Sequence, residues 1–256
     1  MRIIALLPHH STQALQRCMG PSDTLLRASG TLAMTRMISA RTADAVVIDP
    51  IEMGVAEWSR ARLVLQSARI PVLVYTALDP VSVQRVLSAS AIGSYEVLFR
   101  HIDDDAAAMR RRLETLGTPA PPSRLLSMLA GRIERLPSVL QSATVPLFCA
   151  GPVPRWADML ARHADIPRRS VDRWMHRAGL AGTAALLDAA RLARVWVPLV
   201  DGHGPQVDVA VRGGYRRVRM LADHARRIVG VSPAHFGKNL TVSEFVDRLA
   251  AHALRG

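Results

Sequence analysis

The stretch Asp44-Ala-Val-Val-Ile-Asp49 decides the fold of the first part of the chain. Four consecutive apolar residues that end at Asp49-Pro50 are typical of a strand buried on both faces. Similar runs at Arg2–Leu7 and Val72–Thr76 predict strands of the same kind. Strands buried on both faces belong to parallel sheets that helices cover on both sides.

The alternation of strand and helix extends over residues 1–117. The predicted strands are Arg2–Leu7, Thr24–Ser29, Ala45–Asp49, Val72–Thr76 and Tyr95–Arg100. The predicted helices that follow them are Ser11–Met19, Thr31–Arg41, Val55–Ala68, Pro80–Ser90 and Asp103–Leu116. Strands that are each followed by a helix predict an α/β domain with a doubly wound five-stranded parallel sheet.

Several residues of this region resemble the receiver domain of response regulators. Asp49 ends the third predicted strand, at the position of that family's phospho-acceptor. Thr76 ends the fourth strand, at the position of the switch hydroxyl, and Tyr95 takes that of the switch aromatic. The resemblance implies that Asp49 carries a phosphoryl group, provided that the other residues of the receiver site are present.

The rest of that site departs from the receiver pattern. Phosphorylation of an aspartate needs a magnesium ion held by carboxylates, but Pro8, His9 and His10 stand where a receiver has its acidic pair. Leu98-Phe99-Arg100 ends the fifth predicted strand, where a receiver has a lysine. We therefore predict a degenerate receiver-like domain in which Asp49 caps the turn before Pro50. Phosphorylation at Asp49 is the alternative, and we expect His9-His10 to lie in a solvated loop rather than to bind a metal.

The positive charge of the chain is concentrated toward its C-terminal end. The whole chain has 33 basic and 21 acidic residues, a net charge of +12, and Lys238 is its single lysine. Residues 151–256 hold 17 basic and 9 acidic residues, a net charge of +8. Such an excess predicts a polyanionic partner, either nucleic acid or an acidic membrane surface. No apolar run approaches the roughly 18 residues of a membrane span, and we expect a cytoplasmic protein that does not act on membranes.

Two proline-rich stretches divide the chain into three predicted segments. Thr118-Pro-Ala-Pro-Pro-Ser123 is a stretch that we expect no helix to cross. It opens a linker segment, 118–150, with short apolar helices at Arg124–Arg135 and Pro137–Phe148. Gly151-Pro-Val-Pro154 then opens the basic segment, 151–256. The predicted domains are thus 1–117, 118–150 and 151–256.

The basic segment contains two copies of one helical unit, followed by a C-terminal helix. Its predicted helices are Pro154–His163, Arg168–Arg177, Thr183–Val200, Val207–Arg212 and Arg217–Val229. In each copy a short helix, a tight turn and a second helix with a basic face form a helix-turn-helix. The long helix Thr183–Val200 connects the copies. The sequence therefore predicts an all-α tandem helix-turn-helix domain.

Residues 154–236 resemble the AraC/XylS family of transcription regulators. The motifs that carry the resemblance are Leu160-Ala161, Val171–Leu180 with its Ala-Gly-Leu end, Arg191-Leu192, Val209–Tyr215 and Gly230–Pro233. Leu221 and Ala225 depart from it, since large aromatic residues are usual there, and Pro167 replaces a capping serine. The resemblance implies two recognition helices in successive major grooves of DNA.

Arginine suits this role because its planar fork bonds a guanine edge or a phosphate through two donors. By position on the two basic helices, the expected base contacts are Arg169, Asp172, Arg173, Val218, Arg219 and Asp223. The expected phosphate contacts are Arg168, Arg177, Arg216, Arg217, Arg226 and Arg227. Two alternatives are ion pairs within a helix, Asp172 with Arg168, and Asp223 with Arg219 and Arg227. We expect Trp156 and Trp174 in the core.

These features favour a sequence-specific transcription regulator that binds double-stranded DNA. We expect a homodimer formed through the N-terminal half, and RNA polymerase as a partner if the protein is an activator. One rival is a response regulator switched by phosphorylation of Asp49. The other is a DNA-repair enzyme with an AraC-type module, which needs a nucleophilic cysteine in a basic setting. Cys149 lies in an apolar stretch and Cys18 ends a short helix. We therefore expect that the protein is not an enzyme and that it binds no cofactor and no metal.

Overall fold

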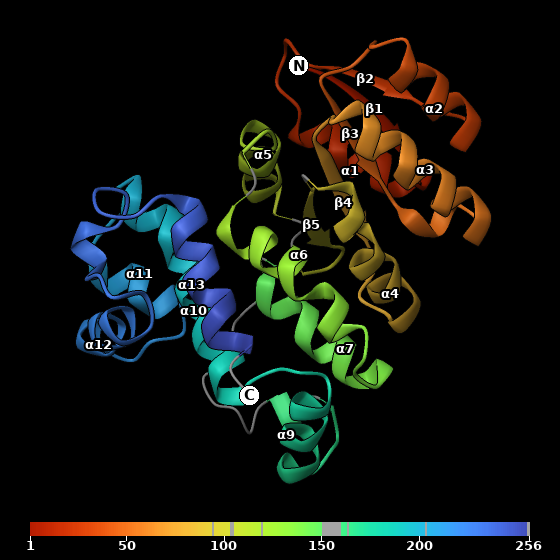
Figure 1. Ribbon diagram of the computed structural model, residues 1–256. Helices are drawn as coiled ribbons and strands as arrows, with labels where there is room; N and C mark the ends of the chain where they lie inside the picture. The colour runs from red at the N-terminus through yellow and green to blue at the C-terminus, as the bar shows by residue number, and fades with distance from the viewer. Residues whose placement is uncertain are drawn as a thin grey trace. The chain divides into compact units, whose positions relative to one another are not determined.

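The computed structural model describes the chain except residues 94, 103–104, 119, 150–159, 163, 203 and 255–256, and except the side chain of residue 108. The chain forms two compact units, Met1–Pro119 and Ala120–Gly256 (Figure 1). We describe each unit by itself.

The first unit contains a sheet of five parallel strands. In chain order they are β1 (Arg2–Leu6), β2 (Thr24–Arg27), β3 (Ala45–Ile48), β4 (Val72–Thr76) and β5 (Tyr95–Phe99). Their order in the sheet is β2-β1-β3-β4-β5, and all pairs are parallel. Every residue of β3 and β4 is buried, which explains why β3 is apolar throughout and why polar Thr76 stands only at the end of β4. The predicted α/β architecture with a five-stranded parallel sheet is confirmed.

Helices cover both faces of this sheet. They are α1 (His9–Cys18), α2 (Thr31–Ser39), α3 (Val55–Ala68), α4 (Pro80–Ser88) and α5 (Ala106–Glu114), with 3₁₀ turns η1 (Pro50–Glu52) and η2 (Ala89–Ile92). Because crossovers between parallel strands are right-handed, α1 lies on one face and α2, α3 and α4 lie on the other. The helix α5 packs beside α1. The predicted acidic start of α5 falls partly on residues 103–104, outside the described residues.

The second unit is helical in its described part. Its helices are α6 (Pro121–Ile133), α7 (Ser138–Thr144), α9 (Arg168–Arg177), α10 (Thr183–Val200), α11 (Gln206–Arg212), α12 (Val218–Val229) and α13 (Val242–Leu254), with 3₁₀ turns η3 (Val145–Phe148) and η4 (Pro233–His235). The helix α10 contacts α6, α9, α11, α12 and α13. Trp196 of α10 stacks on Phe236 and Phe245, with ring centroids 5.3 and 4.3 Å away. The long helix is therefore the centre of the unit.

Among the described residues no helix crosses the proline-rich stretch, as predicted, but α6 begins within it at Pro121, three residues before the predicted start at Arg124. Pro121 and Pro122 are the first two residues of α6, where an amide donor has no partner within the helix and a proline is tolerated. Leu125, Leu126 and Leu129 of α6 are fully buried, and α6 packs on α10 and α13. Most of the segment predicted as 118–150 therefore belongs to the second unit, which begins at Ala120, and the predicted boundary at 151 lies inside that unit.

Other predictions for this unit fall partly outside the described residues. The predicted helix Pro154–His163 is one of them, although residues 160–162 are helical. In the described part of the chain, no helix has the length and the apolar character that crossing a membrane requires.

Candidate nucleic-acid interface

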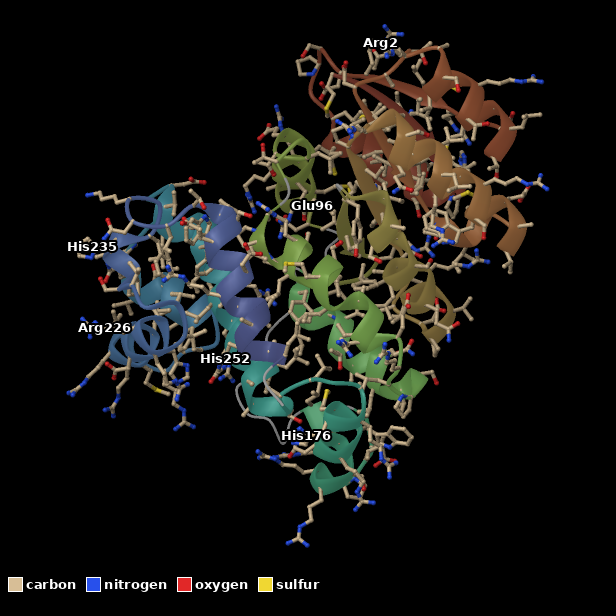
Figure 2. The ribbon with its side chains drawn as sticks, in the orientation of Figure 1. Arg2, Glu96, His176, Arg226, His235 and His252 are labelled. Atoms are coloured by element: carbon tan, nitrogen blue, oxygen red, sulfur yellow. The ribbon has the colours of Figure 1, made fainter. Side chains whose placement is uncertain are left out.

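The helix α9 separates an apolar face from a basic face. Val171 and Met175 are fully buried, because residues four apart lie on the same side of a helix. Arg169, Arg173 and Arg177 are exposed. Figure 2 labels His176 on this helix, which is also exposed. The helix thus presents several cationic side chains to solvent while two apolar side chains anchor it.

The carboxylate of Asp172 does not take the position expected for a base contact. Its Oδ1 accepts hydrogen bonds from the backbone N of Thr183 at 3.0 Å and from the hydroxyl of Thr183 at 2.6 Å. Its Oδ2 lies 3.6 Å from Nε of Arg168. Although burial raises it, these hydrogen bonds and the charge of Arg168 leave the pKa of Asp172 below its usual value. The carboxylate therefore joins α9 to the first turn of α10, and the alternative ion pair with Arg168 is present.

The helix α12 is amphipathic in the same way. Leu221, Ala225 and Val229 are fully buried, so the two small or aliphatic residues that depart from the family pattern do pack. Arg219 and Arg226 are exposed, with side chains 91% and 64% accessible, and Figure 2 labels Arg226. Arg216 and Arg217, just before the helix, are exposed too. Val218 is half-buried.

The ion pairs of α12 differ from the predicted set in one partner. Asp223 lies 3.9 Å from Nε of Arg219 and 3.8 Å from Nη1 of Arg226. Arg227, which we expected beside Asp223 or on a phosphate, instead bonds Oδ2 of Asp188 at 3.0 Å. The carboxylate of Asp223 remains 58% exposed beside these two arginines.

The tryptophan expected in the core lies at its edge. Trp174 is 36% exposed, and the guanidinium of Arg177 sits 5.3 Å from its ring centroid, an arrangement that attracts a cation to an aromatic face. Trp156 lies outside the described residues. The exposed ring of Trp174 widens the solvent-facing surface of α9.

Arginines of two further helices lie against the C-terminal ends of the basic helices. Arg248 of α13 donates a hydrogen bond to the carbonyl of Val229, the last residue of α12. Arg132 of α6 lies over Gly179, where its Nη1 would come 2.8 Å from a Cβ. Gly179 has φ +81°, a conformation that favours glycine. Arg248 thus bonds a carbonyl at the negative end of the α12 dipole, and Arg132 lies beside Gly179, just past the end of α9.

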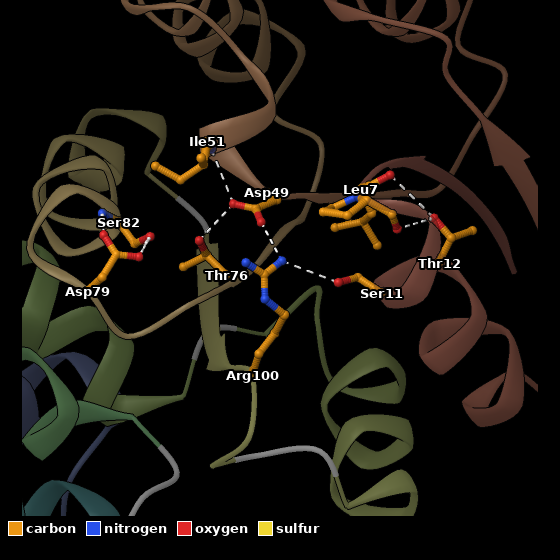
Figure 3. A network of polar contacts seen from close by, with 10 residues as sticks. Leu7, Ser11, Thr12, Asp49, Ile51, Thr76, Asp79, Ser82 and Arg100 are labelled. Atoms are coloured by element: carbon orange, nitrogen blue, oxygen red, sulfur yellow. Dashed lines mark hydrogen bonds and ion pairs between the residues drawn. The ribbon is translucent and has the colours of Figure 1, made fainter.

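In the first unit, the aspartate at the position of a receiver's phospho-acceptor is buried in a polar cluster at the carboxyl edge of the sheet (Figure 3). Asp49 is 1% exposed. Its Oδ1 accepts from the hydroxyl of Thr76 at 2.7 Å and from the backbone N of Ile51 at 3.2 Å. Its Oδ2 accepts from Nη1 of Arg100 at 2.6 Å. The capping role predicted for Asp49 is confirmed, since it is the N-cap of η1.

Arg100 is a site residue whose contact the sequence did not reveal. Its side chain is 14% exposed, and Nη1 also bonds the hydroxyl of Ser11 at 3.3 Å. Figure 3 shows its guanidinium directed at Asp49. A phosphoryl group on Asp49 would have to displace Arg100 or Thr76, because both carboxylate oxygens hold partners. Asp79, the next carboxylate along this edge, is the N-cap of α4 and bonds Ser82.

The cysteines and the acidic residues show no reactive grouping in the described chain. Cys18 and Cys149 are buried, and their thiols bond carbonyls one turn earlier, those of Ala14 and Val145. No cluster of three or more His, Cys, Asp or Glu that could hold a metal occurs among the described residues.

No family model, no curated protein and no solved structure matches the chain.

Proposed function

We propose that the chain is a sequence-specific DNA-binding transcription regulator of the AraC/XylS type, in which α9 and α12 are the recognition helices. The observation that carries the proposal is the shared design of these two helices. Each buries an apolar face in the second unit and exposes a row of arginines. An arginine row on an exposed helix is suited to the major groove, where phosphates attract it and guanine edges bond it.

The connections of these helices support the same proposal. The turn Gly213–Tyr215 links α11 to α12, which contact each other, as in a helix-turn-helix. The helix α10 contacts α9, α11 and α12 and so connects both proposed motifs. Arg169, Arg173 and Arg219 are the arginines among the proposed base contacts, and all three are exposed. Arg168, Arg177, Arg216, Arg217 and Arg226 are the proposed phosphate contacts.

We propose that the first unit is a receiver-like domain that works without phosphorylation. Its strand order is the flavodoxin-like doubly wound order. The ion pair of Asp49 with Arg100 favours this proposal over a phosphorylation switch, because the arginine occupies the carboxylate oxygen that would otherwise be open. We further propose that the chain forms a homodimer through this unit and is cytoplasmic. If it is an activator, RNA polymerase is a further partner.

Selection of DNA from a random pool tests the proposed function. The full chain is incubated with duplexes that carry a randomised central segment, and bound duplexes are amplified and sequenced through several rounds. We expect a shared sequence to emerge, because base contacts from two helices discriminate between sites. Retention of no duplex would contradict DNA binding, and retention without enrichment would contradict sequence specificity.

A further inference from the structure

Asp188, on the second turn of α10, lies where basic side chains of two helices converge. Its Oδ2 accepts a hydrogen bond from Nη2 of Arg227 on α12 at 3.0 Å. Its Oδ1 lies 3.4 Å from Nδ1 of His224 on α12 and 3.6 Å from Nη1 of Arg191 on α10. Asp188 itself is only 15% exposed. One carboxylate thus connects the central helix to two successive turns of α12.

Buried side chains pack around the carboxylate of Asp188 and restrict the movement of the residues that contact it. Tyr215, at the end of the turn before α12, is buried and packs edge-on against His224, with ring centroids 5.6 Å apart. Burial, and then the charge of Asp188, raise the pKa of the Tyr215 hydroxyl. The pKa of Arg191 is lowered by burial, against the effect of Asp188. Asp188 therefore lies among a buried tyrosine, a buried arginine and a histidine that pack around it.

Arg227 differs from the other arginines of α12 in its direction. Arg219 and Arg226 face Asp223 on the exposed side of α12, whereas Arg227 reaches back to α10. Burial lowers the pKa of His224, against the effect of Asp188, so His224 is mainly neutral at neutral pH. Arg227 and Arg191 are then the cations that balance Asp188.

We infer that Asp188 is a positioning residue that, through its hydrogen-bonded ion pair with Arg227, fixes the rotation of α12 against α10. This inference rests on the proposed DNA binding. It assigns Arg227 to the joint between α10 and α12, which is its contact with Asp188, instead of to a phosphate. The rotation matters because side chains that read bases need placement within about 0.5 Å. Phosphate contacts depend mainly on charge and tolerate a shift of the helix. Asp188 thus serves the selectivity of binding more than its strength.

The test compares three substitutions in the full chain. Asp188→Asn removes the charge with little change of shape, and Asp188→Glu keeps the charge. Asp247→Asn is the matched control, because Asp247 is an exposed carboxylate of the same unit, on α13. The probes are the duplex that the wild-type chain enriches from a random pool and a duplex of the same length with that sequence shuffled.

We expect Asp188→Asn to bind the enriched duplex about tenfold more weakly, within the range by which residues outside a binding site alter it. Its affinity for the shuffled duplex should stay within about twofold or rise, because a negative charge is lost. Asp188→Glu should recover much of the preference for the enriched duplex, and Asp247→Asn should match the wild type on both probes. An unchanged preference in Asp188→Asn would overturn the inference while leaving DNA binding intact.

Arg227→Gln decides the matter should Asp188→Asn fail to fold, which circular dichroism would reveal. If Arg227 belongs to the joint between α10 and α12, Arg227→Gln should weaken binding to the enriched duplex and leave the affinity for the shuffled duplex unchanged. Equal losses on both duplexes would make Arg227 a phosphate contact and overturn the inference. A wild-type chain that binds neither duplex would instead overturn the proposed function, and the inference with it.

Discussion

At the scale of single residues, Arg100 determines what the buried carboxylate of Asp49 can do. The two side chains form an ion pair with 14% and 1% exposure, so each charge depends on the other for its stability. The residues are distant in sequence, and parallel pairing of β3, β4 and β5 brings them to one edge of the sheet. The arginine that departs from the receiver pattern is therefore a structural partner of the aspartate.

Removal of this carboxylate should destabilise the first unit. Asp49→Ala leaves the guanidinium of Arg100 buried without its anion, which costs about 3–5 kcal/mol of unfolding free energy. Urea denaturation followed by circular dichroism measures the loss. Incubation of the wild type with a small acyl phosphate should leave its intact mass unchanged. A loss below about 1 kcal/mol, in the range of an exposed pair, or a phosphorylated protein would contradict this role.

Arg173 and Arg226 should differ in what they contribute to DNA binding. Arg173 is exposed in the middle of α9, and Arg173→Ala should cost about 1–3 kcal/mol on the enriched duplex while sparing a shuffled one. Arg226 is near the end of α12, and Arg226→Ala should weaken binding to both duplexes by the same factor. Fluorescence anisotropy with the two probes measures all four affinities. Because both changes remove one positive charge, equal effects of Arg173→Ala on both probes would show that it contacts only phosphates.

His224 should make the stability of the second unit depend on pH. Burial holds its pKa below the ordinary value near 6.5 in the folded chain. The unfolded chain therefore takes up a proton first as the pH falls, and the folded state loses stability as the pH falls through that value. Asp188, Arg191, Arg227, Asp223 and Tyr215 are the groups that face or surround His224.

Thermal unfolding at pH 7.5 and pH 5.5 measures this dependence. We expect the wild type to lose more stability between the two values than His224→Gln, which has no proton to take up. Equal losses in the two proteins would contradict the depressed pKa.

At the scale of helices and strands, much of the architecture is predictable from local pattern. The observed α9 and α10 have the predicted bounds, because apolar positions recur at helical spacing and glycine or proline stands at their ends. The start of α6 is not predictable from the rule that proline breaks helices, since Pro121 and Pro122 occupy the first turn. Asp172 was expected to face DNA because helical position alone does not show that its carboxylate turns toward Thr183.

The helix α6 should be necessary for the second unit to fold. Leu125, Leu126, Leu129 and Ile133 are fully buried, and α6 packs on α10 and α13. Burial of each such side chain contributes about 1.5–3 kcal/mol. A fragment of residues 120–256 should therefore unfold cooperatively, and a fragment of residues 151–256, the basic segment predicted from the sequence, should not. Circular dichroism during urea denaturation distinguishes them, and a cooperatively folded 151–256 would contradict a structural role for α6.

At the scale of the whole molecule, charge and fold point to the same surface. The net charge of +12 is concentrated in residues 151–256, and the structure exposes many of those arginines on α9, on α12 and just before α12. The buried cluster around Asp49 adds no charged surface, because its ion pair is internal. The central claim is therefore that the arginines of the second unit bind the phosphates of DNA while a smaller set reads its bases.

The salt dependence of duplex binding tests this claim most directly. With the five proposed phosphate contacts, at about −0.9 per contact, the logarithm of the association constant should fall with the logarithm of salt concentration with a slope of roughly −4 to −5. The double variant Arg177→Gln, Arg217→Gln should have a slope shallower by about two units. Arg36→Gln, Arg60→Gln removes the same charge from exposed positions of the first unit and should keep the wild-type slope. A wild-type slope near zero, or equal changes in the two double variants, would contradict the claim.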